Sequence, residues 1–254
     1  MNGRHAVRRP PAWRRLAVLF VVLAAGGGPA AAQVENHYQV YEVLEIPLER
    51  KVELSDQFQL PLETALLEAQ THHANPTRKV HAGHEAGIGD VHHHLSWYRL
   101  APEAEPRRTV RLLNQFGQQS IDIGEARYLL VPTEKTSDPN SELPKDLDHY
   151  RCYEVVRINT VPPLPVVQLG DQLETVFGVQ VGGPVYFCPP VRKVHDGQVF
   201  GIQNAENHLT VYRLPPQPHE RAIKVRDQFG EREVRVQRRV FLAVPTIKQA
   251  WVEH

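Results

Sequence analysis

The stretch that decides the fold is RAIKVRDQFGEREVRV, residues 221–236. Apolar and polar side chains alternate in residues 221–226 and again in 231–236, which is the period of a strand with one buried face. The residues between them, Asp227–Gly230, are typical of a tight turn. An Asp side chain can hydrogen-bond to its own backbone there, and Gly supplies a positive φ. The stretch therefore predicts a β-hairpin.

The same turn occurs four times, each time 15–18 residues after the Tyr of an H-x-x-x-Y pattern. Eighteen residues beyond the Asp or Asn the last three copies reach a proline, and the first copy reaches one after twenty. The H-x-x-x-Y pairs are His37/Tyr41, His94/Tyr98, His149/Tyr153 and His208/Tyr212. The turns begin at Asp56, Asn114, Asp171 and Asp227, and the prolines are Pro76, Pro132, Pro189 and Pro245.

The two halves of the chain also match each other at an offset of about 113 residues, as when RKVH at 78–81 recurs at 192–195. Internal repeats of this kind indicate duplicated structural units. We expect an all-β protein with two tandem antiparallel β-sandwich or barrel-like domains, each with an internal pseudo-twofold repeat. The predicted domains are residues 34–135, with units at about 37–80 and 93–135, and residues 146–250, with units at about 149–194 and 207–248. The polar segment 136–145 links them.

Two cysteines, Cys152 and Cys188, lie near the first and last strands of the third unit. The other three units lack both of them. Occurrence together in one unit indicates a structural disulfide, which would stabilise by about 3–4 kcal/mol through loop closure. Two free buried thiols are the alternative.

Residues 1–32 have the composition of a secretory signal peptide: five arginines, an uncharged run at 16–25, and an Ala-rich end before Gln33. The apolar run is shorter than the roughly 20 residues of a bilayer-spanning helix. We expect a secreted or periplasmic protein with no membrane insertion after cleavage. The sequence leaves open whether export uses the Sec or the twin-arginine route.

Charge argues against a nucleic-acid partner. Five of the 29 basic side chains lie in residues 1–32, so 24 remain against 29 acidic ones, which is a net charge of −5. Affinity for nucleic acid depends on clusters of lysine and arginine.

Taken together, H-x-x-C-Y at 149–153, D-Q-F-G at 227–230 and Cys188-Pro189 resemble the motifs of an uncharacterised family of secreted bacterial proteins with tandem, Cys-paired repeat domains. The resemblance covers residues 37 to about 248. It implies export and a β-rich repeat, and it implies no activity. Three of the four units depart from the pattern because they lack the cysteine pair.

Histidine is the unusual feature of the composition, with 14 residues. Imidazole is a common ligand of transition metals, so a divalent metal is the one cofactor that the sequence suggests. A solvated loop beside a structural His94 is the alternative. The candidate ligands are His81, His84, His92, His93 and His94.

The repeated His and Tyr residues invite interpretation as acid/base pairs. Residues four apart on a strand lie about 13 Å apart, however, which is too far for a direct hydrogen bond. We therefore predict that the repeated His, Tyr and turn Asp or Asn residues are structural.

No motif of a hydrolase, kinase, nucleotide-binding protein or metalloprotease is present. The sequence favours a non-enzymatic binding or structural module for a surface polymer or a protein. A histidine-rich metal-binding protein is one alternative, and a hydrolase whose site is not visible in the sequence is another.

Overall fold

The computed structural model describes residues 35–137, 140 and 142–254. The predicted signal peptide lies outside these residues. The described residues form 14 antiparallel strands in one sheet and no helix, so the predicted all-β class is confirmed. Residues 62–69 (LETALLEA), which could also suit a helical turn, lie mostly within a strand.

The strands of the first half are β1 His37–Ser55, β2 Glu63–His81, β3 His84–Ala86, β4 His94–Leu100, β5 Arg108–Asn114 and β6 Gly117–Lys135. Those of the second half are β7 His149–Thr160, β8 Val166–Gly170, β9 Thr175–Gln180, β10 Pro184–Cys188, β11 Pro190–His195, β12 Gln198–Phe200, β13 His208–Asp227 and β14 Gly230–Glu253.

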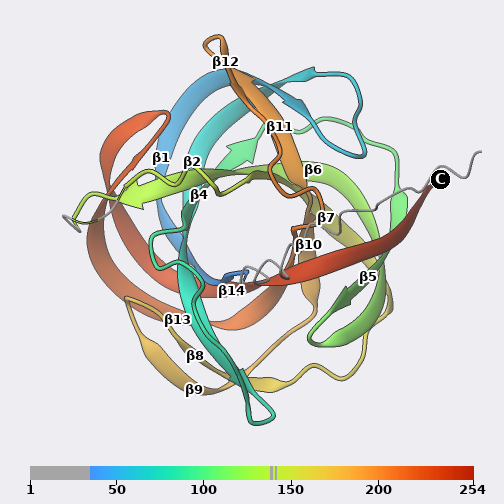
Figure 1. The fold of residues 1–254 in the computed structure, drawn as a ribbon, viewed down its shortest axis with the longest axis vertical. Helices are drawn as coiled ribbons and strands as arrows, with labels where there is room; N and C mark the ends of the chain where they lie inside the picture. Colours follow the sequence, from blue (N-terminus) through green and yellow to red (C-terminus); the bar gives the residue numbers. More distant parts are fainter. Residues whose placement is uncertain (1–34, 138–139, 141) are drawn as a thin grey trace, which may run out of the picture. The chain divides into compact units, whose positions relative to one another are not determined.

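Eight of these strands pair in a closed circuit, which Figure 1 shows as a ring of ribbons. Its order is β1, β2, β4, β6, β7, β10, β13, β14 and back to β1. The four H-x-x-x-Y segments begin β1, β4, β7 and β13. They alternate around the ring with β2, β6, β10 and β14.

The two predicted domains meet in this ring at the β6–β7 and β14–β1 pairings. Each half contributes four neighbouring strands, which alone would leave two unpaired edges. The halves therefore share one sheet, and the expected pair of separate sandwich- or barrel-like domains is corrected to a single ring.

One hydrophobic cluster contains side chains from all eight ring strands and so fills the inside of the ring. Each H-x-x-x-Y segment supplies its second and fourth residues, because successive side chains on a strand point to opposite faces. These residues are Tyr38, Val40, Leu95, Trp97, Tyr150, Cys152, Leu209 and Val211.

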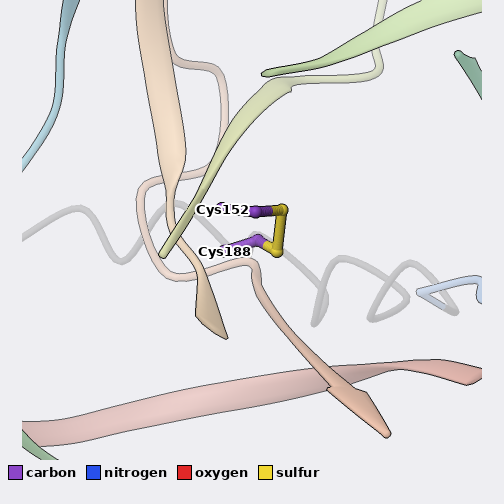
Figure 2. The surroundings of a disulfide bond; sticks show 2 residues. All are labelled: Cys152 and Cys188. Atoms are coloured by element: carbon purple, nitrogen blue, oxygen red, sulfur yellow. A yellow bond between two sulfur atoms is a disulfide. The ribbon is translucent and has the colours of Figure 1, made fainter. Parts of the chain in front are cut away.

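Cys152 on β7 and Cys188 on β10 form a disulfide inside this cluster, with their Cα atoms 4.0 Å apart, so the predicted pairing is confirmed (Figure 2). The pairing of Phe187 with Tyr153 on the same two strands places the two cysteines opposite each other. The cross-strand equivalents of this pair are Val40–Ala74, Trp97–Leu130 and Val211–Ala243.

The strand register also corrects the repeat alignment by one residue. The sequence pattern aligned Pro189 with Pro132 and Pro245, but the proline that lies opposite the residue after the repeated His is Pro190. The doubled proline at 189–190 hides this shift in the sequence.

Beyond the ring the chain forms four hairpin arms, and each arm ends in one of the repeated turns. The arms are the outer parts of β1 and β2, the β5–β6 hairpin, the β8–β9 hairpin and the outer parts of β13 and β14. Their apolar side chains pack in three further clusters that include the ring tyrosines Tyr41, Tyr98, Tyr153 and Tyr212. The arms thus cover the outer face of the ring.

Candidate functional site

Each arm brings the Asp or Asn of its turn to a tyrosine of another unit, and we call each such set of contacts a turn socket. The tyrosine lies two units away around the ring in every case. The hydroxyl donates to a carboxylate in three sockets, whereas in the fourth the Asn amide donates to the hydroxyl. The distances are 2.7 Å for Tyr153–Asp56, 2.9 Å for Tyr41–Asp171, 2.6 Å for Tyr98–Asp227 and 2.7 Å for Asn114–Tyr212.

The Gln of each turn lies against a residue of the preceding unit in the ring. Gln57 contacts His208 at 2.9 Å, Gln228 contacts His149 at 3.3 Å, and Gln115 contacts His37. In the third turn Gln172 instead accepts a hydrogen bond from Lys135 at 2.6 Å. Three of the four repeated histidines therefore hold the turn of a neighbouring unit.

A lysine from the preceding unit also lies over the aromatic ring of three turns. Lys79 lies 4.7 Å from the centre of Phe116, Lys193 5.2 Å from that of Phe229, and Lys248 5.7 Å from that of Phe58. Ammonium groups at such distances are attracted by the aromatic face. Each turn thus joins its own unit to two others.

Burial sets the charge of these residues. It lowers the pKa of His37 to about 3 and of His208 to about 4, and it holds the pKa values of His94 and His149 well below 6.5. It also raises the pKa of Tyr212 to about 12 and those of Tyr98 and Tyr153 well above 10. Near neutral pH these side chains are therefore uncharged.

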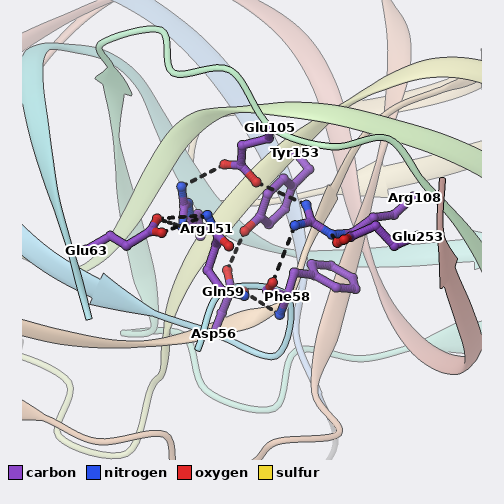
Figure 3. A network of polar contacts seen from close by, with 9 residues as sticks. All are labelled: Asp56, Phe58, Gln59, Glu63, Glu105, Arg108, Arg151, Tyr153 and Glu253. Atoms are coloured by element: carbon purple, nitrogen blue, oxygen red, sulfur yellow. Dashed lines mark hydrogen bonds and ion pairs between the residues drawn. The ribbon is translucent and has the colours of Figure 1, made fainter. Parts of the chain in front are cut away.

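The first socket contains a buried network of charges, shown in Figure 3. Arg151, which lies between His149 and Tyr153 in the sequence, is 2% exposed and donates to Glu105 at 2.7 Å. Glu105 also accepts from Arg108 at 3.1 Å. Asp56 accepts from Tyr153 and from the backbone N–H groups of its own turn. Burial raises the pKa of Asp56 and that of Glu105.

The five candidate metal ligands lie in different surroundings. His81 packs edge-on against Phe116, and His94 stacks on His73 with the ring centres 5.5 Å apart. His93 lies 3.0 Å from Asp146 and 3.4 Å from Asp90. His84 is exposed at the end of the β2–β3 hairpin. Across the described ranges no three His, Cys, Asp or Glu residues are grouped so that they could hold a metal ion.

Three surface pockets lie around the ends of the ring strands that carry the repeated histidines. The first, of about 470 Å³, has a mainly apolar lining that includes Leu147, Val199 and Phe200. The second, of about 300 Å³, is lined by His92, His93 and the acidic Asp90, Glu142 and Asp146. The third, of about 380 Å³, is lined by Glu35, Glu206 and several amide side chains. Among the described residues, the linings of these three pockets contain no Ser or Cys.

Arg151, Glu105 and the lysines of the sockets were not among the residues predicted from the sequence. The lysines had a detectable signal, because Lys79 and Lys193 lie in the repeated RKVH. Arg151 and Glu105 had none, because each occurs in one unit only and their contact joins distant segments.

Within the described ranges there is no helix with the length and apolar character needed to cross a membrane. Neither the curated proteins nor the solved structures contain a match to this chain. Residues 94–245 match the sequence model of a family described as a repeat of unknown function, DUF7450. This match covers more than half of the chain, includes three of the four H-x-x-x-Y segments, and shows that the protein belongs to the DUF7450 repeat family.

Proposed function

We propose that the protein is an exported binding module, in which the repeat builds a scaffold that engages a protein or a surface polymer. The observation that carries this proposal is that the repeated polar residues face other units of the same chain. Each turn Asp or Asn contacts a tyrosine two units away, and three of the four histidines contact a turn glutamine. Residues used in this way hold the fold and leave recognition to the rest of the surface.

The surface offers an anchor for a partner at β9. This strand pairs only with β8 among the described strands, and its Phe177 is 71% exposed. The register skips a residue here: Val167 pairs with Val179 and Leu169 with Val176, so that Phe177 and Gly178 lie in a bulge. Bulges of this kind prevent unspecific edge pairing, whereas exposed aromatic side chains are frequent energetic centres of interfaces. Phe177 is therefore the first residue to test for partner contact.

Export is supported by two features. Residues 1–32 have the pattern of a signal peptide, and Cys152 and Cys188 are joined. Disulfides persist in oxidising compartments and are rare in the cytosol. We infer a secreted or periplasmic location.

The proposal is tested by photo-crosslinking in the cells that produce the protein. The full chain carries p-benzoylphenylalanine in place of Phe177, or, as the matched control, in place of the exposed polar residue Lys224 on the β13 arm. We expect a discrete heavier product, or a polymer-bound smear, from position 177 and none from position 224. Equal labelling at both positions, or none at position 177, contradicts a partner at this surface. Recovery of a chain that still carries residues 1–32, and in which Cys152 and Cys188 are free thiols, would contradict export.

The two alternatives have less support. Of the five histidines of the metal hypothesis, His92 and His93 line the same pocket, and the described residues contain no group of three that could hold a metal ion. The pocket at His93 places an imidazole among carboxylates, but no contact of the described residues assigns a catalytic role to any of them, so the hydrolase alternative stays a prediction without an assigned site.

A further inference from the structure

A pocket of about 470 Å³ lies where the β12 hairpin, the segment before β7 and the fourth turn meet. Pockets that bind small molecules usually measure about 300–1,000 Å³ and combine an apolar lining with a few polar groups. The lining here includes Leu143, Leu147, Val199, Phe200 and Ile202 as apolar residues. Its size and composition therefore match those of a small-molecule site.

The repeat shows that the fold does not require this apolar lining. In the first half the β2–β3 hairpin has the same register as the β11–β12 hairpin, with Glu85 opposite Val80 and Ala86 opposite Lys79. The corresponding residues in the second half are Val199 and Phe200. Likewise Leu147, two residues before His149, corresponds to Glu35, two residues before His37. Only the second half of the chain has apolar side chains at all three positions.

Three apolar side chains of the lining are also exposed to water: Val199 is 59% exposed, Leu143 38% and Ile202 36%. Because burial of apolar surface is favourable, an apolar ligand would gain free energy on covering them. Phe200 packs against His149, whose ring centre is 5.1 Å away, and against Lys193, whose Nζ is 4.3 Å from the Phe200 ring centre. The wall of the pocket is thus supported before any ligand arrives.

The polar group at the base of the pocket is the amide of Gln228. Its Nε2 contacts His149 at 3.3 Å, while its buried Oε1 has no hydrogen-bond partner among the described residues. A buried acceptor without a donor is unfavourable, and a ligand that supplies a donor removes this penalty. If the Gln228 amide is flipped by 180°, its NH₂ group takes the place of Oε1 and is the group without a partner. A ligand hydroxyl can pair with the amide in either orientation, because a hydroxyl both donates and accepts.

We propose that this pocket binds a small, uncharged, mainly apolar molecule with one hydroxyl group, and that the hydroxyl contacts Gln228. The aromatic or aliphatic body of the ligand lies against Val199, Phe200 and Leu147. This site is separate from the partner surface at Phe177, so either proposal can fail without the other.

The test is isothermal titration of the chain from Gln33 onward, which forms one compact unit. The probes are 1-naphthol, 1-methoxynaphthalene, which lacks the donor, and 1-naphthoate, which is charged. We expect 1-naphthol to bind with one-to-one stoichiometry, about fivefold more tightly than 1-methoxynaphthalene, because a typical hydrogen bond contributes about 1 kcal/mol. Tighter binding of 1-naphthoate, or equal binding of the two uncharged probes, overturns the ligand class.

The variant Val199→Glu/Phe200→Ala places the residues of the first hairpin, Glu85 and Ala86, in the second one, and so uses side chains that the fold already accepts there. We expect it to weaken 1-naphthol binding at least about tenfold, because it removes two of the five apolar side chains named above and places a carboxylate beside the ligand. The matched control is Phe177→Ala, which removes an exposed apolar side chain far from the pocket in the sequence and should leave binding unchanged. A variant that binds as well as the wild type overturns the site.

A second copy of the chain is the competing occupant of the pocket. Analytical ultracentrifugation of the wild type and of Val199→Glu/Phe200→Ala decides between the two. A monomer in both cases agrees with the proposal, whereas a dimer that the variant abolishes overturns it.

Discussion

The socket around Asp56 and the socket around Asn114 each join a turn to a tyrosine two units away. The turn side chain is a carboxylate in the first socket and a neutral amide in the second. In the first, a buried carboxylate accepts from Tyr153, and Arg151 occupies the position between the repeated His and Tyr. In the second, a neutral amide donates to Tyr212 and to Thr246, and the position between His and Tyr is Thr210. A carboxylate buried without a nearby cation is unfavourable. Of these two sockets, the one with an arginine holds a carboxylate and the one without an arginine holds a neutral amide.

The other two sockets contain arginines from other places in the chain. Arg232, on the same arm as Asp227, lies 2.5 Å from its carboxylate. Near Asp171, Arg239 pairs with Glu174 at 3.0 Å. An arginine thus acts on the turn Asp itself in two sockets, Arg151 on Asp56 and Arg232 on Asp227, whereas in the third turn the guanidinium pairs with Glu174 and not with Asp171. The contact between turn and tyrosine is the constant feature, and the charges are adjusted locally.

The largest effect is expected from Arg151→Met. It leaves Glu105 and Asp56 buried without their main cation, and loss of one partner of a buried ion pair typically costs about 3–5 kcal/mol of the free energy of unfolding. The matched change in the neutral socket is Thr210→Val, which removes one hydroxyl and should cost about 1 kcal/mol. Urea unfolding at neutral pH measures both. Equal losses in the two variants would show that the charge network adds nothing to the first socket.

Removal of the disulfide by Cys152→Ala/Cys188→Ala is expected to cost about 2–4 kcal/mol, since the bond closes a loop with a sequence separation of 36 residues. Cys152 lies between Arg151 and Tyr153, so the disulfide also fixes the strand that presents both to the first socket. Thermal unfolding of this double variant and of wild type provides the measurement. An unchanged melting temperature would show that the ring holds this strand by pairing alone.

Exchanging the turn residues sharpens the comparison. Asn114→Asp places a carboxylate in the socket without an arginine and should cost about 1–3 kcal/mol. Asp56→Asn keeps an acceptor for the backbone N–H groups and should cost less. The order of the two losses in chemical denaturation is the readout, and the reverse order contradicts charge matching.

The lysines of the sockets lead to a prediction of a different kind, which concerns the pH dependence of the free energy of unfolding. Burial lowers the pKa of Lys193 to about 7, against 10.5 for an exposed lysine. The unfolded chain therefore binds more protons between these two values, and the free energy of unfolding rises with pH in that range. Lys193→Met removes this slope. We expect the variant to gain most over the wild type below about pH 7 and least near pH 10; a constant difference would mean that Lys193 titrates normally.

The sequence was sufficient for the local elements and for the repeat. Alternation and the D-Q-F-G turn predicted the hairpin at 221–236, which the structure confirms as the outer parts of β13 and β14. The occurrence of Cys152 and Cys188 in one unit predicted their pairing, although the doubled proline shifted the alignment by one residue. The partners of Tyr153 and Tyr212 could not be predicted from the sequence, because these contacts join segments about 100 residues apart and depend on closure of the ring. For the same reason the single ring was not foreseen: nothing local specifies that β1 pairs with β14.

The candidate binding pocket could not be predicted from the sequence either. Leu143, Val199 and Gln228 belong to three separate segments, and only the ring brings them together. The difference between Glu85-Ala86 and Val199-Phe200 can be read from the sequence. The strand register is needed to show that the two pairs occupy equivalent positions in their hairpins.

The measurement that tests the account most directly is a pair of double-mutant cycles on the two sockets. One cycle combines Tyr153→Phe with Asp56→Ala, and the other combines Tyr212→Phe with Asn114→Ala; the free energy of unfolding is measured for every variant. If contacts between units hold the ring, both cycles show a coupling energy, of about 1.5–3 kcal/mol in the charged socket and about 0.5–1.5 kcal/mol in the neutral one. Coupling energies near zero in both cycles would contradict the claim that the repeated residues serve the fold.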